Sequence, residues 1–244
     1  NIYNIDMRLI PRLDVKNDYL IKTVCLEGLR KIGNPNEFAR KYADQGADEL
    51  LFMDLVASLY GRNNLYEIIN NITKDIFIPI TVGGGIRNVS DAINLLENGA
   101  DKVLLNSATF SNRELISNLA NQIGSSSVVL SIEAKKIGND WFAFYNSGRE
   151  NSKLTVKEWI KEGINKGAGE ICITSVDREG TEKGFDLDLL KEIKNLEIKK
   201  PLILCGGISS KEDIEEIQKI VDCSAVGVAS VLHYQKKKIS DLRI

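Results

Sequence analysis

Two carboxylates in matching sequence contexts are the residues best suited to do chemistry. Asp14 in "RLDVK" and Glu133 in "SIEAK" each close an apolar, β-branched run that predicts a buried strand. A carboxylate there is costly to bury unless it is paired or has a task. Two that converge on one site could act as general acid and general base. The structural alternative pairs each acid with the lysine two residues on, Lys16 or Lys135, since positions i and i+2 share a strand face.

Glycines and small polar residues predict two sites for phosphate groups. "VGGGI", "CGGI", "LLNSA" and "GVASV" each follow an apolar run. Glycine lets bare backbone N–H groups approach an anion, which a following helix start favours. The first predicted phosphate set is Gly84, Gly85, Asn106 and Ser107; the second is Gly180, Gly206, Gly207, Ala229 and Ser230. One glycine pair usually marks a tight turn, but two matched sets indicate an elongated ligand with a phosphate at each end.

Charged residues stand at the beginnings of four predicted strands, away from these sets. They are Arg8, Glu49, Lys102 and Glu170. We expect their side chains to form a salt-bridged ring across one end of the molecule, because mutually compensating charges cost less to bury than isolated ones. A purely structural plug is the alternative interpretation of this ring.

The elements that must position these residues alternate along the chain. Helical patterns separate the strand candidates, and "NPNEFARKYADQG" shows a cap at Asn34, Pro35 at the first helical position and Gly46 at the end. We predict strands near residues 9–15, 49–54, 78–82, 102–106, 127–133, 170–175, 202–205 and 224–228. Eight strands alternating with helices predict a single (β/α)8 TIM barrel, with an open doubly wound sheet as the alternative.

An internal repeat supports a closed barrel. "PITVGGGI" at 79–86 matches "PLILCGGI" at 201–208, and "GADELLFMD" at 46–54 matches "GAGEICITS" at 167–175. We therefore expect one domain of two similar half-barrels, about 1–122 and 123–244. In such a barrel the active site lies at the carboxyl ends of the strands. The repeat places Asp14 and Glu133 on the first and fifth strands, facing each other across this mouth.

Composition excludes several kinds of partner. The chain has 244 residues, a net charge of −2 and 43% hydrophobic residues, so no basic field attracts nucleic acid or an anionic membrane. It contains no apolar run of membrane-spanning length, and its start lacks the layout of a signal peptide. Four cysteines without CxxC spacing suit buried thiols in a reducing cytoplasm. We predict a cytoplasmic protein without a metal or other cofactor.

The chain resembles the cyclase subunit of imidazole glycerol phosphate synthase over nearly its whole length. The motifs that carry the resemblance are "LDVK", "DELLFMDLVAS", "TVGGGI", "ADKVLLNSA", "GAGEICITSVDREGT" and "CGGI". It implies a heterodimer with a glutaminase subunit that docks on the barrel floor, and ammonia that travels through the barrel to a bisphosphate at the mouth. It also implies that Asp14 and Glu133 are the acid/base pair and that the charged ring gates ammonia. Lys22, in the loop after the first strand, would help to cover the substrate.

The mouth departs from the family pattern. Aspartate is usual at Glu133 and at Glu179 of "DREGT", cysteine is usual at Arg12, and "KT" at Lys22 replaces "KG". These changes favour a paralogue group that passes ammonia to an ATP-dependent enzyme, which makes an acetamidino group on a surface sugar. The histidine-pathway cyclase is the alternative. A phosphosugar isomerase and a non-catalytic ammonia conduit are further ones.

Overall fold

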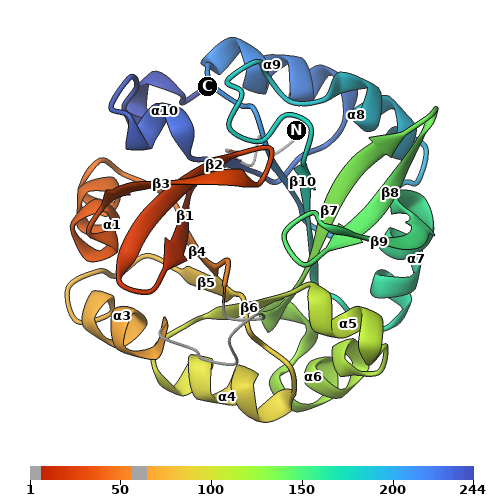
Figure 1. The fold of residues 1–244 in the computed structure, drawn as a ribbon, viewed down its shortest axis with the longest axis horizontal. Helices are drawn as coiled ribbons and strands as arrows, with labels where there is room; N and C mark the ends of the chain where they lie inside the picture. The colour runs from red at the N-terminus through yellow and green to blue at the C-terminus, as the bar shows by residue number, and fades with distance from the viewer. Residues whose placement is uncertain (1–6, 57–64) are drawn as a thin grey trace, which may run out of the picture.

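The computed structural model describes residues 7–56 and 65–244, and its strands close into a barrel surrounded by helices (Figure 1). Within those residues eight parallel strands pair in a ring, and the last pairs with the first. The predicted (β/α)8 barrel is confirmed, and the open sheet is wrong. In ring order the strands are β1 (Arg8–Lys16), β4 (Leu50–Asp54), β5 (Ile80–Gly83), β6 (Lys102–Leu105), β7 (Val128–Ile137), β10 (Glu170–Ser175), β11 (Leu202–Cys205) and β12 (Ala225–Val228).

Helices pack around the outside of the barrel. The Asn34 side chain accepts a hydrogen bond from the Asn36 N–H at 2.8 Å, and Pro35 opens the first helix as predicted. No helix in the described part of the chain is long and apolar enough to cross a membrane. The helices are α1 (Pro35–Asp44), α3 (Leu65–Ile72), α4 (Val89–Glu97), α5 (Ser107–Ser111), α6 (Leu115–Ile123), α7 (Val156–Asn165), α8 (Leu187–Lys194), α9 (Lys211–Ile220) and α10 (Ser230–His233), with short 3₁₀ turns η1 (Ser125–Ser127) and η2 (Ile239–Asp241).

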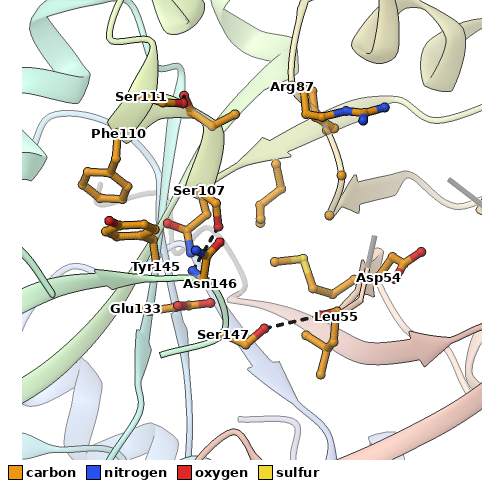
Figure 2. A pocket seen from close by; sticks show the side chains of 17 residues that line it. Asp54, Leu55, Arg87, Ser107, Phe110, Ser111, Glu133, Tyr145, Asn146 and Ser147 are labelled. Carbon is orange, nitrogen blue, oxygen red and sulfur yellow. Dashed lines mark hydrogen bonds between the residues drawn. The ribbon is translucent and has the colours of Figure 1, made fainter. Parts of the chain in front are cut away.

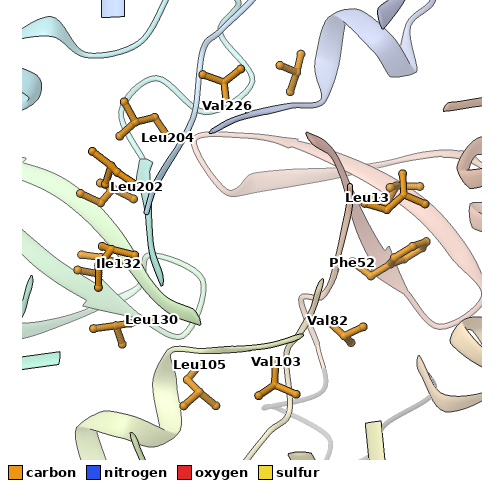
Figure 3. Close-up of a cluster of buried hydrophobic side chains, with 14 of the residues drawn as sticks. Leu13, Phe52, Val82, Val103, Leu105, Leu130, Ile132, Leu202, Leu204 and Val226 are labelled. Atoms are coloured by element: carbon orange, nitrogen blue, oxygen red, sulfur yellow. The ribbon is translucent and has the colours of Figure 1, made fainter. Parts of the chain in front are cut away.

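Alternation along the strands divides the buried side chains into two clusters. Outward-facing residues such as Leu13 and Phe52 pack against the helices (Figure 3). A smaller inner cluster, including Ile10, Leu51 and Leu104, fills the barrel. Since successive side chains point to opposite faces, Arg12 and Asp14 share the inward face of β1 with Ile10.

Two β-hairpins at the mouth were missed by the sequence-based prediction. One consists of β2 (Tyr19–Val24) and β3 (Glu27–Gly33), and the other of β8 (Asp140–Tyr145) and β9 (Glu150–Thr155). The prediction that a strand ends at Glu133 is wrong, because β7 runs on to Ile137 and pairs with β8. Glu133 lies where this strand leaves the barrel for the hairpin.

Candidate active site

Glu133 is a buried acid with an unusual protonation equilibrium. Its residue is 4% exposed, and the Gly148 N–H donates to its Oε2 at 2.7 Å. Burial raises the pKa of Glu133 to about 7, with a smaller contribution from the Asp14 charge, although the Gly148 hydrogen bond, Arg12 and Asn106 favour the charged form. A carboxyl group that titrates near neutral pH can both accept and donate a proton.

The first predicted phosphate set and Glu133 line the same cavity, which has a volume of about 420 Å³ (Figure 2). All four predicted residues, Gly84, Gly85, Asn106 and Ser107, are in its wall. Gly84 has φ of +97°, and a Cβ there would lie 2.2 Å from the Asp54 carbonyl oxygen. The backbone therefore requires glycine at this position and remains open to a ligand.

The tip of the β8–β9 hairpin forms a further part of the cavity wall that we did not predict. Asn146 and Ser147 line the cavity, and with Gly148 they have φ of 53°, 58° and 72°. The Asn146 N–H donates to Ser107 Oγ at 3.0 Å. Left-handed conformations in non-glycine residues are costly and concentrate at functional sites. The sequence "NSG" is a turn signal that could have located this tip.

Asp14 is paired with Arg12. Arg12 Nε donates to Asp14 Oδ1 at 2.8 Å, and Asp14 Oδ2 is buried without a hydrogen-bond partner in the described residues. The structural alternative, in which each acid pairs with the lysine two residues on, is wrong. Among the described residues Lys16 and Lys135 make no ion pair with either acid, since Arg12 bonds to Asp14 and the Gly148 backbone bonds to Glu133.

The second predicted phosphate set lines a much smaller cavity, of about 10 Å³. Its wall contains Gly180, Gly206, Gly207, Ala229 and Ser230, together with Arg12 and Glu179. The tip of the β2–β3 hairpin packs beside Gly180 of this set, because the Cys25 N–H donates to the Glu179 carbonyl oxygen at 2.7 Å. A Cβ at Gly180 would lie 2.3 Å from the Thr23 carbonyl oxygen. The two sets are therefore unequal, since one lines a large cavity and the other a small one.

Lys22 lies in strand β2 rather than in a loop, which corrects the sequence-based prediction. Its ammonium forms a buried ion pair with Glu179 and donates to the Thr23 carbonyl oxygen. Burial would raise the pKa of Glu179, but Lys22 and Arg12 outweigh it and lower that pKa. Lys22 is not among the residues that line either cavity.

The four charged residues of the barrel floor form a closed ring. Arg8 contacts both Glu49, at 2.6 Å, and Glu170, and Lys102 contacts the same acids at 3.2 and 3.0 Å. Thr81 Oγ1 donates to Glu49 at 2.6 Å. Charges of alternating sign thus close the end of the barrel opposite the cavities.

Comparison with known proteins identifies the family. The family model described as "Histidine biosynthesis protein" matches residues 8–238. An imidazole glycerol phosphate synthase subunit HisF of Legionella pneumophila is 54% identical over 209 residues, which cover 85% of this chain and 98% of that protein. Proteins of the same name from Sulfurisphaera tokodaii and Helicobacter hepaticus are each 39% identical over 97% of this chain and 94% and 93% of their own lengths.

The chain belongs to the histidine biosynthesis protein family. This membership confirms the family resemblance stated from the motifs. Of the motif "DELLFMDLVAS", Ala57 and Ser58 lie outside the described residues. The names of these family members support the histidine-pathway alternative better than the sugar-amidation interpretation that the altered mouth favoured.

Proposed function

We propose that the chain is the cyclase subunit of a glutamine-dependent imidazole glycerol phosphate synthase in histidine biosynthesis, an enzyme of the lyase class. The observation that supports this most directly is Glu133, a carboxyl with a pKa of about 7 in the wall of the 420 Å³ cavity beside Gly84, Gly85 and Ser107. This arrangement suits a phosphorylated substrate that undergoes proton transfer. The names of the relatives favour the same activity.

Ring formation from ammonia needs groups that move protons. When ammonia forms a bond to carbon, its nitrogen must lose protons, and elimination of a leaving group must return one. Glu133 can do both near neutral pH, while the Gly148 N–H holds one of its oxygens. Asp14 Oδ2, which has no partner among the described residues, is the second proton acceptor in this proposal.

The ammonia would come from a glutaminase subunit docked on the floor of the barrel. The ring of Arg8, Glu49, Lys102 and Glu170 closes this floor, and the apolar inner cluster lies above it. Neutral ammonia crosses an apolar interior far more easily than ammonium does. Opening of one ion pair would admit it, so the ring serves as a gate in this proposal.

Delivery of ammonia to a sugar-amidating enzyme is a second candidate, which one observation favours. Arg12 bonds to one oxygen of Asp14 and lines the small second cavity, so the mouth is changed where a bisphosphate would react. An ATP-dependent amidating enzyme would then be the further partner. A phosphosugar isomerase would have no use for the floor ring.

Ammonia-dependent cyclisation of the imidazole-forming bisphosphate, with added ammonium and no glutaminase, distinguishes these candidates. The cyclase should turn over at about one per second or faster. Asp14→Asn should abolish turnover, because an amide is neither acid nor base, and Glu133→Asp should hold or raise it. If the folded wild type is about a thousandfold slower and both variants are equally inactive, the result supports the second candidate, delivery of ammonia to a sugar-amidating enzyme.

A further inference from the structure

The Arg12 side chain crosses the interior of the barrel, and one of its three nitrogen atoms makes no hydrogen bond to the described residues. It stands on β1, and its Nη1 donates to Thr174 Oγ1 on β10 at 3.0 Å, while its Nε bonds to Asp14. The residue is 5% exposed. Within the described part of the chain, its third nitrogen, Nη2, makes no hydrogen bond. Nη2 is not among the fully buried polar atoms that lack a partner, so it keeps some accessible surface where a ligand could reach it.

Burial alone would lower the pKa of Arg12, but the charges of Asp14 and Glu179 outweigh it and raise that pKa well above its ordinary value. The guanidinium is therefore a permanent positive charge in the mouth. A charged donor that faces a cavity without a protein partner suits an anionic ligand.

The only histidine of the chain, His233, connects the Arg12 backbone to helix α10, which begins at Ser230 of the second phosphate set. His233 ends α10, which begins at Ser230, and its Nε2 lies 3.0 Å from the Arg12 carbonyl oxygen. Since a carbonyl only accepts, Nε2 carries the proton, and Nδ1 accepts from the Tyr42 hydroxyl at 2.6 Å. Burial lowers the pKa of His233 to about 3, so the ring stays neutral and this tautomer persists.

These contacts place the guanidinium beside the second phosphate set. Arg12 lines the small cavity together with Gly206, Gly207 and Ser230. Gly207 has φ of +82°, and a Cβ there would lie 2.3 Å from the Gly184 carbonyl oxygen, so its backbone stays bare. A cation, bare glycine backbone and a serine hydroxyl together are a set of groups that binds phosphate.

We propose that Arg12 is a ligand-binding residue of the second cavity, where its Nη2 and the backbone around Gly206 and Gly207 hold a phosphate group of the substrate. This inference rests on the bisphosphate ligand of the proposed function. A cavity of about 10 Å³ is too small for a phosphate group, so the groups around it must move apart when the ligand binds. Cysteine, usual in the family at this position, offers neither charge nor a planar donor.

Inorganic phosphate tests the inference without any turnover, so its outcome does not depend on the cyclisation assay. Crystals of the complete chain grown in phosphate should show one anion in each cavity, and titration calorimetry should report two sites. Arg12→Met leaves Asp14 buried without its partner, so the decisive variant is the double substitution Arg12→Met with Asp14→Asn, which removes both charges together. It should lose the second anion, weakening that site at least about tenfold, and keep the first.

Three further variants separate ligand binding from a structural role. Arg12→Lys should restore part of the second-site affinity, and Thr174→Val, which removes the bond at Nη1, should weaken the second site only. Ser107→Ala is the matched control and should weaken the first site only. An unchanged second anion in the double variant, or a second cavity that stays empty in wild-type crystals whose first cavity is filled, would overturn the inference.

Discussion

Replacing Glu133 by glutamine should stabilise the fold at neutral pH. The pKa of Glu133 is about 7 in the folded protein and about 4.5 in the ordinary, exposed state. The folded state therefore binds the proton more tightly than the unfolded state, and this stabilisation is complete below pH 4.5. It is lost as the pH rises to 7 and beyond, because the carboxylate must then be buried in charged form. A difference of 2.5 pH units corresponds to about 3 kcal/mol.

The neutral amide avoids this cost. Its carbonyl oxygen can still accept the hydrogen bond from the Gly148 N–H, and its volume matches that of the acid. Above pH 7 we expect Glu133→Gln to exceed the wild type by up to about 3 kcal/mol in the free energy of unfolding. Near pH 4 the two proteins should be equally stable, since the acid is then protonated in both folded and unfolded chains.

Urea denaturation at pH 4, 6 and 8 measures this difference directly. Glu67→Gln, at an exposed position of α3, is the matched control and should show no gain that grows with pH. The same Glu133→Gln protein should be inactive in ammonia-dependent cyclisation, because the amide cannot transfer a proton. If its stability relative to the wild type does not change between pH 4 and 8, Glu133 is not a carboxyl of raised pKa, and its assignment as a proton-transfer group fails.

Two other predictions concern the remaining charged sites. The pKa of His233 is about 3 in the folded protein and 6.5 ordinarily, so the unfolded state binds a proton that the folded state does not. As the pH falls from 6.5 to 3, the wild type should therefore lose up to about 1.4 kcal/mol of unfolding free energy per pH unit. His233→Gln should lack this loss when both proteins are unfolded in urea. An equal pH dependence in both would contradict this. Glu49→Lys places a third cation in the floor ring and should weaken co-purification with a glutaminase or stop glutamine-dependent activity, while ammonium-dependent activity persists. Unchanged glutamine-dependent activity would remove the basis for a gate.

The barrel strands could be predicted because each is an apolar run with a clear boundary. β10 and β11 coincide with the predicted ranges 170–175 and 202–205, since both strands are buried over their whole length. The floor ring could also be anticipated, because strand beginnings in a barrel meet at one end. The first phosphate set follows from the same geometry, since strand ends meet at the mouth.

The hairpins could not be predicted in this way. β3 reads "EGLRKIG" and is mostly exposed, so it has no buried face to give a period of two. The partner of Asp14 was missed for a related reason. Arg12 and Lys16 both lie two residues from the acid, and only the closed barrel shows that Arg12 points into the interior while Lys16 is partly exposed beyond the rim.

The two hairpins give the mouth its asymmetry. The Gly148 N–H at the β8–β9 tip donates to Glu133 in the wall of the large first cavity, whereas the β2–β3 tip packs on Gly180 beside the small second cavity. Thr23 packs against Gly180 at the edge of the second cavity and accepts a hydrogen bond from Lys22 of the buried Lys22–Glu179 ion pair. If ligand binding at that end displaces the hairpin, the free energy of disturbing this ion pair is subtracted from the affinity. Substrate affinity should therefore depend more on the β2–β3 hairpin beside the second cavity than on the β8–β9 hairpin beside the first.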